Sequence, residues 1–472
     1  MNIDPASLTL NSALAALRCR DFTCLELTQA CLRMIEQFNP SINAFITLTP
    51  ELAVESAMQA DALLEHQPSN LDDLALLGLP LAIKDLFDTA GIRTTAGTRF
   101  FADNIPTQDA AAVLKLKMAG AVILGKTNTH EIALGVTGVN PHFGAVKNPW
   151  DQTRITGGSS SGSAAAVACG MSLAALGTDT GGSIRIPASL CGLVGLKPTF
   201  GRVSTRGVLP LSWNLDHVGP LAHTVLDAAM LLEVLAGFDP HDSASLDVPV
   251  GDYLTHLREG VKGWHVALGV GEYVEASDPE VLEALNSAAQ CFKDLGAEVE
   301  KVDLSWISDL AQANTRMTRA DAAAFHRERL DAHPDWFGAD VLQRLQEGAS
   351  LSSTGYSLAR HTQVEARRRF EMFFTKYDIL LLPTTPIPAP PIEGTDAIKA
   401  ALQLTRFTSP FNLTGLPALS MPSGFSGVGL PMGLQIVSKF WAEARVLQAA
   451  SAFEQATAWH QGRPDLVKPR TG

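Results

Sequence analysis

Two glycine- and serine-rich turns carry the residues that are best suited to chemistry. The first turn, residues 157–162, reads GGSSSG, and the second, residues 179–185, reads DTGGSIR. Glycine allows backbone conformations that are closed to other residues and lets a ligand approach the main chain closely. Both turns are flanked by Ala, Val, Leu and Ile, whereas disordered segments are poor in such residues. The turns are therefore expected to be fixed inside a packed domain and not to form a flexible linker.

A serine in either turn could serve as a nucleophile if a neighbouring base takes its proton. Ser160 is the central serine of a G-x-S-x-G match, the nucleophile elbow of α/β-hydrolases. That elbow follows a strand, and residues 150–154 (WDQTR) have no clear strand pattern. Neither turn matches the G-x-x-x-x-G-K-[ST] or G-x-G-x-x-G phosphate-binding patterns. The elbow is the weaker interpretation of these serines, and a phosphate site is weaker still.

Lys84 is the candidate base. It follows the apolar residues 81–83, which predict a buried strand that ends at the lysine. A lysine at the end of a strand is more often a solvated surface charge. A lysine can act as a base only when it is neutral, and burial favours the neutral form by lowering the pKa. The apolar approach to Lys84 is the kind of context that buries it.

Lys84, the GGSSSG turn and the DTGGSIRIPA turn together resemble the amidase signature family. This family includes bacterial amidases, fatty acid amide hydrolase and the A subunit of glutamyl-tRNA(Gln) amidotransferase. The resemblance runs through most of the chain and includes LPLAIKD, GKTNTHE, HFGAVKNPWD, LTGLPALSMPSG and GLPMGLQIV. It implies a single large α/β domain with a central mixed β-sheet covered by helices on both faces. It also implies an amidase that cleaves a carboxylic amide, with aryl amides, esters and carbamates as further substrates, and without a metal or an organic cofactor.

The resemblance implies a role for each part of this Ser-Ser-Lys arrangement. Ser183 would be the nucleophile that carries the acyl group, and Ser159, after a cis Gly158–Ser159 peptide bond, would pass its proton to Lys84. The oxyanion hole would consist of the main-chain N–H groups of Thr180, Gly181, Gly182 and Ser183. Such successive N–H groups, with little side-chain bulk, can converge on the oxygen that becomes negative during amide cleavage.

Four further residues are predicted to support this site. Asp179 and Arg185 flank the nucleophile turn and are expected to pair and hold it. Thr137 and Gly158 are expected to contact the substrate, because the segment around Thr137 lines the pocket in relatives of this family. No Cys/His cluster has the spacing of a zinc site, so no metal ligand is predicted.

Alternating strands and helices must position these residues. Residues 264–268, 279–295 and 298–304 predict a strand, a helix and a strand, the pattern of a βαβ unit. Near the N-terminus, Thr23 and Glu26 form a capping-box pattern at a predicted helix start, and Asn39-Pro40 predicts its end. We expect one domain over residues 1–472, with a helical segment at 1–65, a catalytic core at 66–240 and a helical substrate-pocket segment at 305–376.

Composition limits the possible partners. The chain has 472 residues and a net charge of −13, which argues against nucleic acid and anionic membrane surfaces. Its six cysteines include no C-x-x-C pair and are expected to be free thiols of the core. The first ten residues lack a basic region followed by an apolar run, so the cytoplasm is the expected location.

The expected partner is a small-molecule amide substrate, with no nucleic acid and no membrane. A homodimer is left open, because relatives are often dimers. Two other functions remain: the A subunit of a tRNA amidotransferase, which would supply ammonia to a partner, and a binding protein that has lost catalysis. Residues 316–356 show no clear counterpart of the segment that recognises glutamine in that subunit, and a stand-alone enzyme is therefore preferred. The intact Lys84, Ser159 and Ser183 argue against an inactive protein.

Overall fold

The structure, a computed structural model, describes residues 3–66 and 74–468. Its strands are β1 (Phe45–Leu48), β2 (Pro80–Lys84), β3 (Val122–Thr127), β4 (Lys147–Asn148), β5 (Asp151–Ile155), β6 (Ala174–Asp179), β7 (Val194–Lys197), β8 (His217–Ala222), β9 (His265–Val270), β10 (Glu298–Asp303), β11 (Ile379–Pro383), β12 (Ala418–Phe425) and β13 (Pro431–Val437). Its α-helices are α1 (Leu10–Cys19), α2 (Cys24–Ile42), α3 (Pro50–His66), α4 (Ala111–Met118), α5 (Ser161–Ala168), α6 (Arg185–Cys191), α7 (Val225–Leu235), α8 (Glu272–Glu275), α9 (Pro279–Asp294), α10 (Ser308–Phe325), α11 (Arg327–Ala332), α12 (Ala339–Ala349), α13 (Ser353–Phe373), α14 (Ala397–Leu404), α15 (Ser409–Thr414) and α16 (Glu443–Ala456).

Eleven strands form one mixed sheet in the order β1-β3-β2-β6-β8-β7-β12-β13-β11-β9-β10, and β4 and β5 form a separate pair. The strand β2 runs parallel to both β3 and β6, and β9 runs parallel to β10 and β11. The strands between these two parallel groups pair antiparallel. A single α/β domain with a mixed central sheet confirms the predicted fold class.

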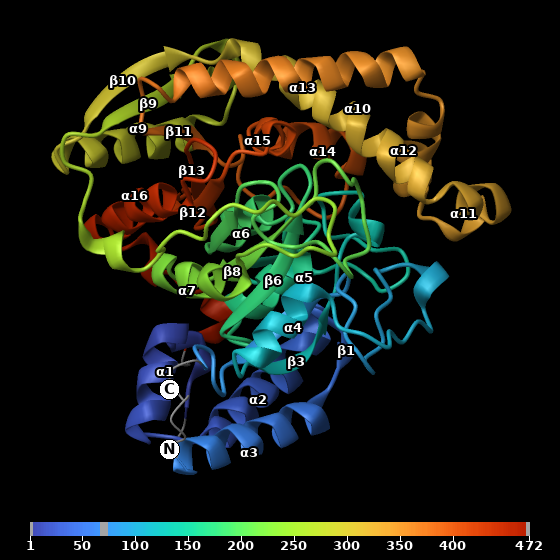
Figure 1. Ribbon diagram of the computed structural model, residues 1–472, viewed down its shortest axis with the longest axis vertical. Coiled ribbons are helices and arrows are strands. Elements are labelled where there is room, and N and C mark those ends of the chain that lie inside the picture. Colours follow the sequence, from blue (N-terminus) through green and yellow to red (C-terminus); the bar gives the residue numbers. More distant parts are fainter. Residues whose placement is uncertain (1–2, 67–73, 469–472) are drawn as a thin grey trace.

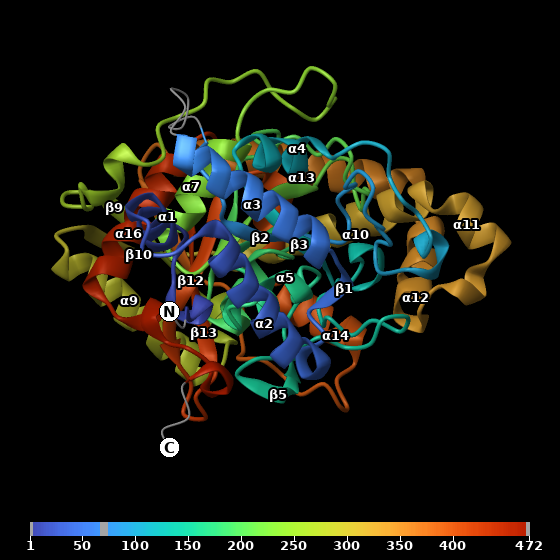
Figure 2. The ribbon, with the colours of Figure 1, turned by 90° about the horizontal axis from the view of Figure 1, so that it is seen from below.

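Helices cover the sheet on both sides. The short helix α5 contacts β2, β3, β6 and β8, and α6 contacts β7, β12 and β13. The helices α4, α7, α16 and α9 contact one another in turn and form a second layer. In Figure 1, α10, α12 and α13 lie at one end of the molecule and the N-terminal helices α1–α3 at the other. Figure 2 shows α2 and α3 side by side across the face that is seen from below.

The helix α5 lies in the tightest part of the core. All of its residues, SGSAAAVA, are buried. A Cβ atom on Gly162 would lie 2.2 Å from the carbonyl oxygen of Ala44 and 2.5 Å from the backbone nitrogen of Asn128, so only glycine fits there. The small residues after the first glycine turn therefore allow the helix to approach its neighbours closely and to fix that turn within the domain.

Local predictions are mostly confirmed. The helix α2 begins after Thr23 with both hydrogen bonds of the capping box to Glu26. The predicted end of this helix at Asn39-Pro40 is wrong, because the helix runs through Pro40 to Ile42 and ends at Asn43 in the left-handed conformation. The βαβ unit is present as β9, α9 and the parallel strand β10. The proposed division into segments stays a prediction, and residues 67–73, beside the 65/66 boundary, lie outside the described residues.

Candidate active site

Lys84 is the last residue of β2, and its side chain is completely buried. Its Nζ lies 2.7 Å from the Ser159 Oγ and 2.7 Å from the Thr178 Oγ1. Thr178 is near the end of β6, the parallel neighbour of β2. Parallel strands end at the same edge of a sheet, where α/β proteins gather their functional groups. The topology therefore brings the lysine and the two hydroxyls together.

Burial changes the acid–base behaviour of Lys84. Removal from water disfavours the charged amine and lowers the pKa of Lys84 to about 7, although Asp179 and Asp216 act in the opposite direction. An exposed lysine would remain almost fully protonated at neutral pH. In this site a substantial fraction of Lys84 is uncharged near neutrality and can accept a proton.

Ser159 is also completely buried and follows a cis Gly158–Ser159 peptide bond. Its carbonyl oxygen accepts hydrogen bonds from the Thr129 hydroxyl at 2.8 Å and from the His130 N–H at 3.2 Å. The Ser159 side chain is thus held by Lys84, and its backbone carbonyl by the segment 129–130. Within the described residues, the predicted lysine and the predicted bridging serine form one hydrogen-bonded pair.

Ser183 lies on the turn after β6 and lines a cavity. Its carbonyl oxygen accepts a hydrogen bond from the Ser160 N–H at 3.2 Å, which joins the two glycine-rich turns. No hydrogen bond links the Ser183 and Ser159 hydroxyls in the part of the chain that the structure describes. Catalytic hydrogen bonds are often long in proteins without substrate and shorten in the complex. Lys84 and Ser159 are thus in direct contact, with Ser183 on the adjacent turn.

The hydroxyl of Ser160, the alternative nucleophile, is hydrogen-bonded to the protein backbone. Its hydroxyl donates to the Thr178 carbonyl at 3.2 Å and accepts from the Thr178 N–H at 3.3 Å, and the side chain is completely buried. Residues 151–155 do form a strand, β5, but this strand pairs with β4 and, through a single bridge from Arg154, with Pro391, and it is not part of the main sheet. The setting of a nucleophile elbow, an exposed serine after a central strand, is therefore not found at Ser160.

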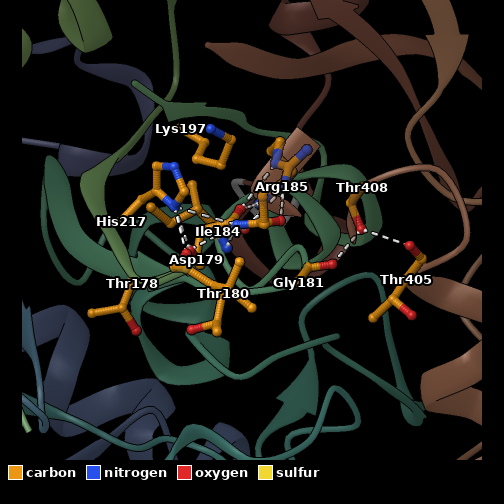
Figure 3. Close-up of polar contacts among 12 residues, drawn as sticks. Thr178, Asp179, Thr180, Gly181, Ile184, Arg185, Lys197, His217, Thr405 and Thr408 are labelled. Atoms are coloured by element: carbon orange, nitrogen blue, oxygen red, sulfur yellow. Dashed lines mark hydrogen bonds and ion pairs between the residues drawn. The ribbon is translucent and has the colours of Figure 1, made fainter. Parts of the chain in front are cut away.

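The turn from Thr180 to Ser183 is held by its carbonyl groups. Asn314 donates its side-chain N–H to the Thr180 carbonyl at 3.1 Å. Thr408 donates its hydroxyl to the Gly181 carbonyl at 2.6 Å (Figure 3). Because the carbonyl and the N–H of one peptide point in opposite directions, these contacts also fix the next two N–H groups. Among the described residues, none of the N–H groups of residues 180–183 donates to another protein group.

Asp179 and Arg185 form a buried ion pair beneath this turn (Figure 3). The Arg185 guanidinium donates to the carboxylate from Nε at 3.0 Å and from Nη2 at 2.9 Å. Asn412 donates to the same carboxylate at 2.8 Å. Burial alone would raise the pKa of Asp179, but the charge and hydrogen bonds of Arg185 outweigh it and hold that pKa well below its usual value. The ion pair is present as the sequence suggested, and the Asp179 carboxylate is held in its charged form.

A narrow cavity of about 80 Å³ opens beside Ser183. Its lining comprises Ala133, Leu134, Gly135, Val136, Thr180, Gly181, Ser183, Leu211, Asn314, Thr315, Thr318, Arg319, Arg344, Ala401, Leu402 and Thr405. Thr137 and Gly158 are not part of this lining. Thr137 follows the lining segment, with its hydroxyl 3.4 Å from the His130 Nδ1. Gly158 lies behind the same segment, since a Cβ atom there would meet the backbone of Val136. Their predicted substrate contact stays a prediction.

Thr178, Asn412 and Asp216 belong to this site but are not among the predicted residues. Thr178 has a local signal, because it lies at the end of a strand directly before the second glycine turn. Asn412 is 233 residues from Asp179 and has no local signal. Asp216 contacts Thr180 across 36 residues and likewise has no pattern of its own. Three-dimensional contact alone identifies the last two.

Within residues 3–66 and 74–468, no group of three or more His, Cys, Asp and Glu side chains is arranged to hold a metal ion. All six cysteines are free thiols, and four of them are buried. In that same part of the chain, every helix is too short or too polar to cross a membrane.

This fold and the chemistry of its site define an enzyme of the hydrolase class that acts on C–N bonds. The family model described as Amidase matches residues 26–447. The chain belongs to the amidase signature family.

Individual relatives narrow the comparison. The glutamyl-tRNA(Gln) amidotransferase A subunit of Geobacter sp. (strain M21) is 40% identical over 97% of this chain and 99% of its own length. A solved structure described as an amidase is 36% identical with a TM-score of 0.83, and the match covers 95% of this chain and 99% of that chain. A second solved structure is the inhibitor-bound form of a vestigial protein complex that reveals the evolutionary origins of an s-triazine catabolic enzyme, and its matching chain is 31% identical. That chain has a TM-score of 0.90, and the match covers 95% of this chain and 98% of that chain.

The expected partners need correction. The sequence suggested a small-molecule amide as the partner, no nucleic acid or membrane, and at most a second copy of the chain. This expectation is wrong, because relatives that match almost the full length are components of an amidotransferase. The correction concerns protein partners, which net charge could not indicate, since it describes the average surface of the chain and not a single interface.

Proposed function

We propose that this chain is the amide-cleaving component of a protein assembly, with glutamine as its candidate substrate. The observation that carries the proposal is the buried Lys84–Ser159 pair, 2.7 Å apart, in which Ser159 lies on the turn adjacent to that of Ser183. The full-length likeness to amidotransferase A subunits favours an assembly over an enzyme that acts alone. This revises the preference for a stand-alone enzyme.

In the first step, the Ser183 Oγ attacks the amide carbonyl carbon and forms a C–O bond. Its proton moves to the Ser159 Oγ, and the Ser159 proton moves to the neutral Lys84 Nζ. Negative charge collects on the carbonyl oxygen, where N–H groups of residues 180–183 would stabilise it. One such donor is typically worth about 3 kcal/mol of transition-state stabilisation.

In the second step, the C–N bond breaks and the proton returns from Lys84, through Ser159, to the leaving nitrogen. A primary amide thus releases ammonia and leaves an ester on Ser183. Water then attacks this ester and loses its proton along the same route, and the carboxylic acid departs with the hydroxyl of Ser183 restored. In an assembly, the ammonia would pass to the partner for transfer.

The cavity suits a small amide that carries a carboxylate. Arg319 and Arg344 line this cavity together with the apolar segment 133–136. Arg344 donates to the Leu134 carbonyl and pairs with Asp340, and Arg319 pairs with Glu347. A substrate carboxylate would therefore share these guanidinium groups with the protein's own carboxylates. A guanidinium pairs well with a carboxylate. Both arginines lie within the segment 316–356, in which the sequence alone shows no glutamine-recognition motif.

The test is ammonia release from glutamine by the tagged chain purified from its own host with any bound proteins, and by the chain alone. We expect hydrolysis that depends on co-purified protein and disappears in Ser183→Ala, which removes the nucleophile and leaves the buried turn intact. A Ser183→Ala assembly that still hydrolyses glutamine would exclude this nucleophile. A wild-type assembly that never hydrolyses glutamine would exclude this substrate.

A second candidate is an amidase that acts without a partner on another small amide. The 36% identity to a solved amidase favours it. A panel of acyl amides, aryl amides, esters and carbamates, tested with the chain alone, distinguishes the two. Turnover of one of these compounds without any co-purified protein, combined with no turnover of glutamine, would select the second candidate.

A further inference from the structure

The loop before β8 folds around one buried carboxylate, that of Asp216. Its Oδ2 accepts hydrogen bonds from the N–H groups of Leu211 at 2.8 Å and Ser212 at 3.1 Å. Its Oδ1 accepts a hydrogen bond of 2.5 Å from the Thr180 hydroxyl. The two oxygens of one side chain thus hold two separate segments of the chain.

Both segments border the cavity. Thr180 is the first residue of the turn that leads to Ser183, and Leu211 forms part of the cavity wall. The Thr180 carbonyl is held from the other side by Asn314. Thr180 is therefore fixed at its side chain by Asp216 and at its backbone by Asn314, so the direction of the following N–H groups depends on both contacts.

We propose that Asp216 is a positioning residue, whose carboxylate aligns the Thr180–Ser183 turn with the cavity wall and so orients the N–H groups that stabilise the oxyanion. The inference rests on the proposed function, because it assigns a purpose to the geometry of that turn. Nothing in the proton-transfer steps requires Asp216 to touch the substrate.

The charge of Asp216 also reaches Lys84. The charged and titratable groups around it are Lys84 on β2, Asp179 on β6 and His217 on β8, with Asp321 of α10 beyond Ser212. Burial raises the pKa of Asp216 to about 6, while its hydrogen bonds and Lys84 act in the opposite direction. Asp216 and Lys84 thus titrate in neighbouring ranges, and the charged form of Asp216 favours the protonated lysine. Removal of that charge lowers the pKa of Lys84.

A purely structural role, in which Asp216 only closes its own loop, predicts a different result. In that case, removal of the Thr180 hydroxyl would not change the rate at which Ser183 is labelled. Asp321 provides a matched control, because its Oδ2 accepts from the Ser212 hydroxyl at 2.5 Å and from the Asn214 amide at 3.1 Å. It holds the same loop but does not contact Thr180.

The experiment measures the rate at which a fluorophosphonate probe labels Ser183, from pH 5.5 to 9.5, and needs neither substrate nor partner. Asp216→Asn cannot accept all three hydrogen bonds, and Thr180→Val removes the hydroxyl contact. We expect both variants to label about tenfold more slowly or worse, since small displacements of catalytic groups are costly. Thr180→Ser keeps the hydroxyl and should recover most of the labelling rate that Thr180→Val loses. The double variant should be no slower than the worse single variant, because both remove one interaction.

The pH profile separates positioning from general damage. In Asp216→Asn the midpoint of the labelling rate should move to lower pH, whereas in Asp321→Asn it should stay where it is. If Asp216→Asn does not fold, Thr180→Val and its rescue by Thr180→Ser decide the question. The inference would be overturned, with the proposed function left standing, by either of two results. One is a folded Asp216→Asn that labels at the wild-type rate with an unmoved midpoint. The other is a wild-type labelling rate in Thr180→Val. A wild-type chain that does not label at Ser183 would overturn the proposed function, and this inference with it.

Discussion

Lys84 and Ser159 meet through a hydrogen bond of 2.7 Å in which both side chains are completely buried. Any charge on the lysine is thus separated from bulk water, while its carboxylate neighbours Asp179 and Asp216 only partly compensate. A neutral amine at this position can accept the proton of a hydroxyl, but an ammonium group cannot. In the proposed mechanism, the protonation state of this one buried amine therefore determines whether the site is active.

The first prediction concerns pH. Because the neutral lysine is the active form and burial lowers the pKa of Lys84 to about 7, the rate of Ser183 labelling should rise with pH through about 7 and level off above about 8. Fluorophosphonate labelling from pH 5.5 to 9.5 measures this rise. A rate that is independent of pH from 6 to 9.5, with intact protein throughout, would contradict a lysine base.

The second prediction concerns Thr178, the other partner of the Lys84 amine. Thr178→Val keeps the shape of the side chain but leaves the amine with one partner fewer in a buried site. A lost hydrogen bond of this kind costs about 1–2 kcal/mol, so labelling should slow roughly tenfold. Thr178→Ser, which retains the hydroxyl, is the matched control and should label like the wild type. Equal rates for all three proteins would mean that Thr178 does not orient the lysine.

The parts of the site that were predictable are those with local signals. The apolar residues before Lys84 indicated its burial, and the two glycine-rich turns indicated where backbone N–H groups could be exposed to a ligand. The paired charges of Asp179 and Arg185 lie six positions apart and were also predictable. Each of these features depends on residues that are close in the sequence, and the sequence pattern alone therefore predicts it.

The remaining parts depend on contacts between distant segments. Asn412 reaches Asp179 only because α15 packs beneath the turn, and Arg319 and Arg344 reach the cavity only because α10 and α12 fold over it. The helix end at Asn39-Pro40 was mispredicted for a related reason. A proline disrupts a helix by its missing N–H and its ring, yet the packing of Phe38 and Ile42 against the core continues the helix past it.

The third prediction concerns the stability provided by the Asp179–Arg185 pair. Arg185→Met leaves the buried carboxylate of Asp179 without its cation, and breaking such a pair costs about 3–5 kcal/mol of unfolding free energy. Urea unfolding measures this loss. Arg368→Met on α13 is the control, since Arg368 forms an ion pair with Glu371 with its side chain 73% exposed, and should change stability by less than about 1 kcal/mol. Equal losses of unfolding free energy in the two variants would show that burial does not increase the contribution of the Asp179–Arg185 pair to stability.

The fourth prediction concerns Gly182, within the turn that leads to Ser183. Its φ is +136°, and a Cβ atom there would lie 2.3 Å from the Thr408 Oγ1 and 2.6 Å from the Ile186 Cδ1. Gly182→Ala must therefore displace the turn or the Thr408 hydroxyl that holds it. Because the N–H groups of this turn would lose their alignment, labelling of Ser183 should fall about 100-fold or more.

Gly91→Ala separates this effect from backbone strain. Gly91 also has a positive φ, +74°, but a Cβ atom there would have no neighbour within 4 Å. The left-handed conformation should cost the variant about 1–2 kcal/mol of stability, with labelling at the wild-type rate because the turn at residues 180–183 is untouched. A Gly182→Ala protein that is folded and labels as fast as Gly91→Ala would mean that the N–H groups of this turn do not stabilise the charge that develops at Ser183.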